Sequence, residues 1–230
     1  MDNTMWSYLN KRMQQQSPNY QNSNTSPGPV ICISREVGCK GVKFAQQLAA
    51  ELEKQPGNKK WKVISKEILA ESARELNMDP AKLQSILHNK DRSAFDDILN
   101  AFSEKRYKSD GKIRKTLIDL ISSFANDGYC IIVGRAGHII ARDIEKSLLV
   151  RLTAPLEWRI QQTMKLNDLN EKEAIDFMTK IEEERLNLRK HIADDSAKHD
   201  TFDLTIDLSR MDIPATIDII KLAAKSRGLL

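Results

Sequence analysis

Two glycines in residues 30–52 have the spacing of a loop that could hold phosphate. Gly38 and Gly41 follow an apolar run and precede a segment of helical periodicity. A helix that begins after such a loop directs backbone N–H groups and a partial positive charge toward it, and anions bind there. Glycine lets the backbone approach phosphate oxygens closely. The spacing alone leaves phosphate binding and an ordinary strand-to-helix turn equally open.

The full P-loop pattern is not present. It requires Gly-Lys-Ser/Thr, whose lysine reaches the terminal phosphates and whose hydroxyl holds Mg²⁺, and this tripeptide occurs nowhere in the chain. Lys40 and Lys43 could supply positive charge from neighbouring positions, whereas the metal ligand is missing. Cys39 lies just before the predicted helix, where a thiol pKa can fall, but we favour its interpretation as an incidental small residue.

Arg135 and Arg159 are candidate phosphate ligands near predicted strand ends. Arg135 follows the apolar run 129–133, and ligands of open α/β sheets collect beyond the carboxyl ends of the strands. Its planar guanidinium could bind a phosphate there, or it could pair with a structural carboxylate. Arg159 lies four residues after Pro155, on the side of a predicted helix that faces the loops.

Arg185 and Arg189 fall within the apolar stripe of a long predicted helix, whose other members are Ala174, Phe177, Ile181, Leu188 and Ile192. A guanidinium on the inward side needs a partner, because an unpaired buried charge is very costly. A phosphoryl group in transfer would be such a partner, since its reaction needs positioning and positive charge. The alternative is a network with the glutamates of 182–184 on a solvated helix.

Five apolar segments alternate with helical ones and must position these residues. The predicted strands are 30–33, 61–65, 129–133, 147–153 and 202–208. The first and third have no polar alternation, which is typical of strands covered on both faces. The alternation predicts an α/β fold, a parallel sheet of about five strands with helices on both faces and right-handed crossovers.

Local signals predict several helix ends and buried faces. We expect helix starts at Asp79–Pro80, at Asn170 with Glu173 three residues later, and near Pro214. The predicted buried positions of three helices are Val42, Ala45, Leu48, Ala49 and Leu52; Ile113, Leu117, Leu120, Ile121 and Phe124; and Ile217, Ile220, Leu222 and Ala223.

Composition restricts the class of protein. The 230 residues are 40% hydrophobic, enough for one domain with a core. Although the net charge is +4, the basic residues are dispersed among acidic ones, which argues against nucleic-acid binding. No apolar run has membrane-spanning length and the N-terminus lacks a signal-peptide core, so we expect a cytoplasmic protein without membrane contact. The histidines show no metal-ligand spacing, and three cysteines argue against a disulfide framework.

Five motifs together resemble the cytidylate kinase-like family, which is similar to the P-loop nucleoside monophosphate kinases. They are ISREVGCKG at 33–41, IIVGRAG at 131–137, VRLTAPLEWR at 150–159, ER at 184–185 and FDLTID at 202–207. Members of that family typically have a serine-arginine-x-x-glycine loop in place of the Walker lysine pattern, here Ser34, Arg35 and Gly38. The resemblance covers residues 29–230 and leaves 1–28 as a polar tail that is expected to be disordered.

This resemblance implies a P-loop kinase-like fold and phosphoryl transfer from ATP, with Mg²⁺, to a nucleoside monophosphate such as CMP or dCMP. The donor phosphates would be held by the loop, namely Ser34, Arg35, Gly38, Cys39, Lys40, Gly41, Val42 and Lys43. Arg135 would bind the acceptor phosphate, and Arg159, Arg185 and Arg189 would neutralise the charge in transfer. Helices at about 65–106 would cover the acceptor, and those at about 159–195 would form a lid.

Two features of the sequence, one compared with the standard P-loop and one with cytidylate kinases, favour another hypothesis. The hydroxyl residue of the loop is absent, and Ala136 replaces the aspartate that follows the matching arginine in cytidylate kinases. A non-catalytic nucleotide-sensing or scaffold protein with a degenerate P-loop would tolerate both. The retained arginines favour the enzyme, since a scaffold does not require cations that converge at strand and helix ends.

Overall fold

The chain folds around a five-stranded parallel sheet. The computed structural model describes residues 28–55, 59–66, 111–193 and 201–230. The strands are β1 (Val30–Arg35), β2 (Lys62–Ile64), β3 (Cys130–Val133), β4 (Ser147–Thr153) and β5 (Leu204–Asp207). Their order in the sheet is β2-β3-β1-β4-β5, and every neighbouring pair is parallel. The predicted α/β fold is therefore confirmed, with strands at the expected places.

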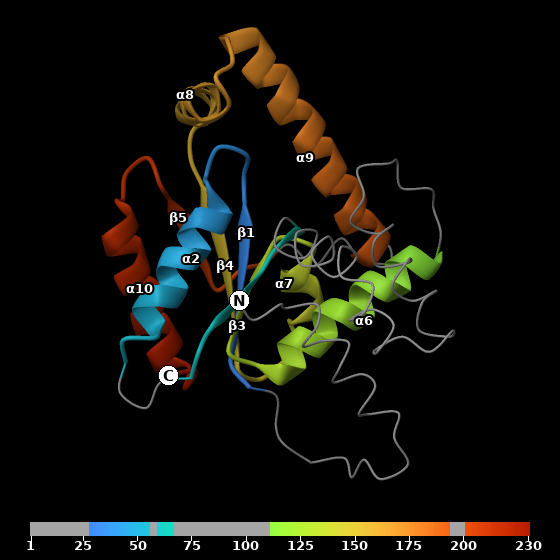
Figure 1. Cartoon of the computed structure of the whole chain (residues 1–230), viewed down its shortest axis with the longest axis vertical. Helices are drawn as coiled ribbons and strands as arrows, with labels where there is room; N and C mark the ends of the chain where they lie inside the picture. The colour runs from blue at the N-terminus through green and yellow to red at the C-terminus, as the bar shows by residue number, and fades with distance from the viewer. Residues whose placement is uncertain (1–27, 56–58, 67–110, 194–200) are drawn as a thin grey trace, which may run out of the picture.

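Helices cover both faces of the sheet and its carboxyl edge. They are α2 (Gly41–Leu52), α6 (Gly111–Asp127), α7 (Gly137–Ile140), α8 (Leu156–Asn167), α9 (Glu171–Ala193) and α10 (Ile213–Ser226). Figure 1 shows α2 and α10 on one face, α6 and α7 on the other, and the α8–α9 pair beyond the carboxyl ends of the strands. The three layers and this capping hairpin place the ends of β1 and β4 beneath α9.

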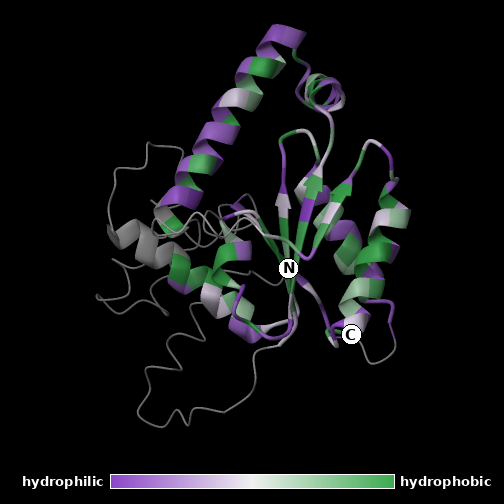
Figure 2. Cartoon of the chain, turned by 180° about the vertical axis from the view of Figure 1, so that it is seen from behind, coloured by the Kyte–Doolittle hydropathy of each residue, from purple (hydrophilic) through white to green (hydrophobic). Residues whose placement is uncertain are grey.

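The main core lies between the sheet and the layer of α2 and α10. The first four residues of β1 are at most 1% exposed, as expected for the central strand of a parallel sheet. From α2, the buried side chains are Phe44, Ala45, Leu48, Ala49 and Leu52, so the predicted stripe is confirmed except that Val42 is only half-buried. Hydrophobic residues are accordingly concentrated in the strands in Figure 2, while α9 is mostly hydrophilic.

Local capping signals are confirmed at two helices. The backbone N–H of Asn170 donates to Glu173 Oε2 at 2.9 Å, and the N–H of Glu173 donates to Asn170 Oδ1 at 3.0 Å, a reciprocal capping box before α9. In α10, Asp212 is the N-cap and accepts from the Ala215 N–H at 2.8 Å, with Pro214 in the first turn.

Two predicted apolar positions are wrong. Leu222 of α10 is 71% exposed, and Phe177 of α9 is 39% exposed. The buried residue beside Phe177 is Met178, which joins Ala174 in a small cluster with Val37 and Ile160. This cluster contacts a narrower face of α9 than the predicted stripe, because α9 packs on α8 and on the loop after β1 instead of a broad sheet.

Several predictions lie outside the described residues. These are the tail at 1–28 apart from its last residue, the helical region at 65–106 apart from its first two residues, and the helix start at Asp79–Pro80. In the described ranges, no helix combines the length and the apolar character that a bilayer span requires.

Candidate active site

The loop between β1 and α2, residues 36–40, lies at the carboxyl edge of the sheet. Gly38 has φ +97°, and a Cβ atom on it would lie 2.8 Å from the carbonyl oxygen of Arg159 in α8. Glycine is thus needed there for close packing against α8 as well as for its dihedral angle. Lys40 caps α2 in the left-handed region, with φ 44°.

Some backbone N–H groups of this loop and of the first turn of α2 donate hydrogen bonds to described residues of the protein, and others do not. The N–H of Val37 donates to Glu182 Oε1 of α9 at 2.8 Å, and that of Cys39 donates to the Glu36 carbonyl at 3.3 Å. The amides in the first turn of α2, residues 41–43, donate to no acceptor in the part of the chain that the structure describes. A helix start with such donors attracts anions.

Arg35 ends β1 and extends across this helix start. A Cβ on Gly41 would lie 2.9 Å from Arg35 Cγ, and one on Gly134 would overlap Arg35 Nη1. The guanidinium therefore lies between the N-terminus of α2 and the turn after β3. An anion in that place would interact with both the cation and the helix dipole.

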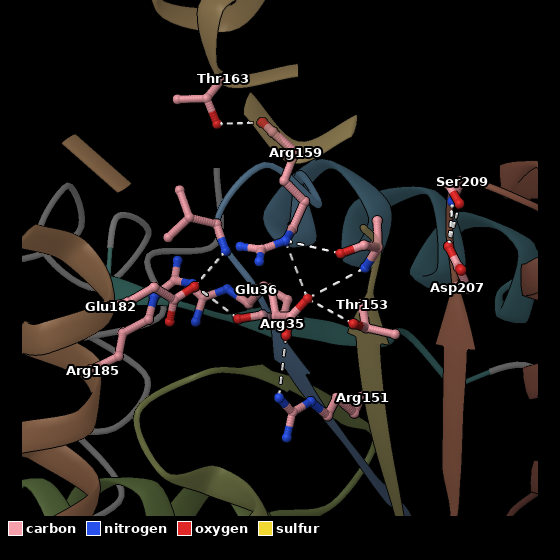
Figure 3. Close-up of polar contacts among 12 residues, drawn as sticks. Arg35, Glu36, Arg151, Thr153, Arg159, Thr163, Glu182, Arg185, Asp207 and Ser209 are labelled. Carbon is pink, nitrogen blue, oxygen red and sulfur yellow. Dashed lines mark hydrogen bonds and ion pairs between the residues drawn. The ribbon is translucent and has the colours of Figure 1, made fainter. Parts of the chain in front are cut away.

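Glu36 contacts the end of β4, the residue that follows it and helix α8, as Figure 3 shows. Its Oε2 accepts from Thr153 Oγ1 at 2.6 Å and from the Ala154 N–H at 3.3 Å, and lies 3.3 Å from Arg159 Nε. Its Oε1 accepts from Arg151 Nη2 at 3.3 Å. Burial acts to raise the pKa of Glu36, but the Thr153 hydrogen bond, the Arg159 charge and the other donors outweigh it, and the pKa lies below its usual value.

The long helix α9 contacts the loop through a charged pair (Figure 3). Arg185 Nη1 donates to the carbonyl oxygen of Arg35 at 2.9 Å and lies 3.6 Å from Glu182 Oε1. The side chains of both residues are partly buried. Val37 also packs its side chain into the α8–α9 cluster. The loop and α9 are therefore joined by apolar, hydrogen-bonded and charged contacts.

A cavity of about 200 Å³ opens between the sheet edge and α9. Its lining residues are Ser34, Arg35, Glu36, Arg151, Arg159, Glu182, Arg189 and Phe202. Four guanidinium groups face two carboxylates, so the lining has an excess of two positive charges. Such a lining fits an anion with two charges, as a phosphate group carries.

The structure brings together only some of the predicted site residues. Ser34, Arg35, Arg159 and Arg189 line the cavity, and Arg185 adjoins it. The remaining loop residues, Gly38, Gly41 and Val42, lie beside it in the loop and the first turn of α2.

The two lysines and Arg135 lie elsewhere. Lys40 Nζ donates to Gln162 Oε1 of α8 at 3.1 Å, and Lys43 is exposed on α2; neither lines the cavity. Arg135 also lies outside the lining, in a turn where Gly134, Arg135 and Ala136 have φ of 72°, 53° and 52°. Successive left-handed residues other than glycine are strained, and strain of this kind is concentrated at functional sites.

Cys39 contributes to packing through its side chain. It is 1% exposed within the main core, and burial, with the Glu36 charge as a further cause, raises its pKa to about 11. This agrees with the interpretation as an incidental small residue and argues against an activated thiol.

Arg151 and Glu36 are site residues that we did not predict. Glu182 belongs to the glutamates of the alternative arginine–glutamate network, and its Oε1 lies 3.6 Å from Arg185 Nη1. Arg151 is the one charged residue of the predicted strand 147–153, which is the signal that could have revealed it. The role of Glu36 depends on partners 115 to 118 positions away in the sequence.

The carboxylates of the site suit one mode of Mg²⁺ binding. The described residues contain no group of three or more metal-ligating side chains, but Mg²⁺ commonly uses one or two carboxylates together with substrate phosphates and water. Glu182 lines the cavity and has its Oε2 without a hydrogen bond to any described residue. This carboxylate fits a phosphate-bound Mg²⁺.

Comparisons with known proteins agree with the fold. A model of the cytidylate kinase-like family matches residues 30–210. An uncharacterized protein from Eubacterium ventriosum of known crystal structure has TM-score 0.60 and 21% identity, over 86% of this chain and 98% of its own. The crystal structure of TT1252 from Thermus thermophilus has TM-score 0.38 and 16% identity, over 86% of this chain and 98% of its own. No curated protein matches the chain.

Proposed function

Because this chain belongs to the cytidylate kinase-like family, we propose that it is a phosphotransferase that moves a phosphoryl group from ATP to a nucleoside monophosphate, such as CMP or dCMP, or a related small acceptor. The observation that carries the proposal is the convergence of arginines from β1, β4, α8 and α9 at one cavity beside the start of α2. Phosphoryl transfer depends mainly on positioning and on charge stabilisation.

The donor phosphates bind at the start of α2. The amides of residues 41–43 are available donors there, and the Arg35 guanidinium lies across the same helix end. This arrangement replaces the lysine of a standard P-loop with an arginine from the preceding strand. Lys40 and Lys43 remain close in sequence to this helix end, and we propose that they add charge at the outer side of the phosphates.

The charge that develops during transfer is stabilised from α8 and α9. Arg159 is held by Glu36 and by the Ala154 carbonyl, to which its Nε donates at 3.0 Å. Arg185 is held by the Arg35 carbonyl, and Arg189 lines the cavity one turn further along α9. Guanidinium groups fixed in this way need little reorganisation when charge develops, which is the basis of electrostatic catalysis.

Mg²⁺ would be held by the nucleotide phosphates and Glu182. It would neutralise phosphate charge and orient the groups in reaction. The residues of the chain bind and orient the two nucleotides, and α9 limits the access of water to the cavity that it covers.

A nucleotide-sensing or scaffold protein is the second candidate. It is favoured by the contacts of Lys40, which donates to Gln162 and not into the cavity, and by the missing hydroxyl residue of the loop. A sensor would bind ATP without turnover.

The test is a titration panel of ATP, CMP, dCMP, UMP and AMP with Mg²⁺, by thermal shift and isothermal calorimetry, followed by ADP release for each pair. We expect ATP and one monophosphate to bind and ADP to appear only when both are present. Binding of ATP without acceptor-dependent ADP release supports the sensor, and absence of nucleotide binding at millimolar concentration contradicts both the kinase and the sensor and leaves the scaffold.

A further inference from the structure

Arg151 is an arginine inside β4 that none of the roles above includes. We propose that Arg151 binds the phosphate of the acceptor, so that the acceptor is a phosphomonoester whose phosphate lies in the cavity under α9. The identification of the ligand as an acceptor rests on the proposed function. The arginine itself is identified by its strand position, its contacts and the charge of the cavity.

The position of Arg151 in the sheet is unusual for a charged residue. β4 lies between β1 and β5, and Arg151 is paired in register with Ser34 on one side and Thr205 on the other. Its neighbours Val150 and Leu152 point into the main core. Because side chains alternate along a strand, Arg151 points to the opposite face, toward the cavity that it lines. A charge on an interior strand needs a partner or a ligand.

The protein partners of Arg151 use only part of its guanidinium. Among the described residues it donates one hydrogen bond, from Nη2 to Glu36 Oε1 at 3.3 Å, and its Cζ lies 5.7 Å from the ring centre of Phe202. The side chain is 38% exposed. These two contacts fix the direction of the side chain, while most of its five N–H donors remain for a ligand.

A second arginine pair in the molecule provides the contrast. Arg227 donates to Asp203 Oδ1 at 2.9 Å, and its side chain is 44% exposed. This pair has a shorter contact and lies outside the cavity lining. Two arginines of similar exposure thus differ in whether they face a positively charged cavity.

The size of the cavity selects the group that enters it. About 200 Å³ is below the 300–1,000 Å³ that is usual for whole small-molecule ligands. A phosphate with its ester oxygen is small enough, and the rest of the acceptor would extend beyond the opening. The excess of two positive charges matches a phosphomonoester dianion.

The resemblance to cytidylate kinases assigns the acceptor phosphate to Arg135 instead. Arg135 lies in the strained turn after β3 and outside the cavity lining. If Arg151 binds the acceptor phosphate, Arg151→Gln should weaken acceptor binding. If Arg135 binds it, Arg135→Gln should do so instead.

The experiment measures binding of CMP and of cytidine, which lacks the phosphate, to wild type and to the variants Arg151→Gln, Arg135→Gln and Arg227→Gln. We expect Arg151→Gln to raise the Kd for CMP about 10- to 100-fold, as for a lost charge-assisted contact, with the Kd for cytidine unchanged. Arg227→Gln should leave both unchanged. Where ADP release is measurable, the KM for CMP should rise and that for ATP should change less than about twofold.

Three results would overturn the inference. They are equal CMP affinity of Arg151→Gln and wild type, an equal loss of cytidine binding, or a loss of CMP affinity in Arg135→Gln alone. If CMP does not bind wild type, inorganic phosphate is the probe, and failure of phosphate to bind, or binding that does not depend on Arg151, overturns the inference as well. Binding that depends on Arg151 without any ADP release upholds the anion site and contradicts the kinase.

Discussion

The two faces of β1 and β4 differ in what their side chains do. Toward α2 and α10, Ile33, Val150 and Leu152 join an apolar core. On the other face, near the carboxyl ends, Ser34 and Arg151 line a charged cavity, and Thr153 donates to Glu36. The same strands therefore supply stability from one set of alternate residues and binding groups from the other. Substitutions on the apolar face should act mainly on unfolding, whereas those on the charged face should act on ligand binding and have smaller effects on stability.

The largest effect on stability is expected in the apolar layer. Phe44 of α2 is 1% exposed and the largest fully buried side chain there. Phe44→Ala should lower the free energy of unfolding by about 3–5 kcal/mol, because it leaves a cavity. Leu222→Ala on α10 is the matched control: the side chain is 71% exposed, and we expect a change within about 0.5 kcal/mol. Similar values for the two variants in urea denaturation would contradict the assigned core.

A smaller loss is expected where the loop contacts α8. Gly38→Ala combines φ +97° with a clash against the Arg159 backbone, so we expect a loss of about 3 kcal/mol. Gly228→Ala separates the two causes, since Gly228 has φ +68° but no atom within 4 Å of an added Cβ, and should cost about 1 kcal/mol. Equal losses in thermal unfolding would show that packing against α8 contributes nothing.

A substitution of Glu36, in the loop after β1, tests the charged side of the site. Glu36→Gln should reduce the unfolding free energy by about 1–2 kcal/mol at pH 7, because it weakens the hydrogen bonds from Thr153 and the two arginines. The pKa of Glu36 is lowered in the folded protein, so its stabilisation is present above the pKa of the unfolded chain, near 4.5, and is lost as pH falls through the folded value.

The measurement for Glu36 is urea denaturation of wild type and variant between pH 7 and pH 3. The difference between them should shrink on acidification. Glu183→Gln, at an exposed carboxylate of α9, controls for the change in net charge. A difference that stays constant with pH would contradict the role of the Glu36 carboxylate.

The sequence predicts the elements that supply the apolar core better than it predicts the contacts of the charged cavity. The strands, the stripe of α2 and the Asn170–Glu173 box depend on local periodicity and on neighbours a few positions away, and all three were predicted. The Glu36 network and the contact of Glu182 with the Val37 amide join residues 115 to 145 positions apart. Such contacts follow from the pairing of β1 with β4 and from the packing of α9 on the loop, for which no local pattern exists.

The arginines of the site were predicted from the sequence better than the Glu36 network but less completely than the strands. Helical spacing predicts that Arg159 faces the loops and that Arg185 and Arg189 lie on the inward side of their helix, and the structure places all three at or beside the cavity. Lys40 and Lys43 were selected by proximity to the glycines in sequence, yet neither lines the cavity, since Lys40 Nζ donates to Gln162 Oε1 and Lys43 is exposed on α2. The position of a residue on a helix face therefore predicts whether its side chain reaches the cavity better than its proximity in sequence to the loop glycines does.

The most direct test of the account compares two adjacent residues of α9. Arg189 lines the cavity, whereas Lys190 is exposed, so Arg189→Gln and Lys190→Gln remove the same charge from different faces. We expect Arg189→Gln to reduce kcat/KM for acceptor-dependent ADP release by about 10²-fold or more, Lys190→Gln to change it less than about twofold, and both to keep the wild-type melting temperature within about 2 °C. Equal rates in the two variants would contradict phosphoryl transfer in the cavity under α9.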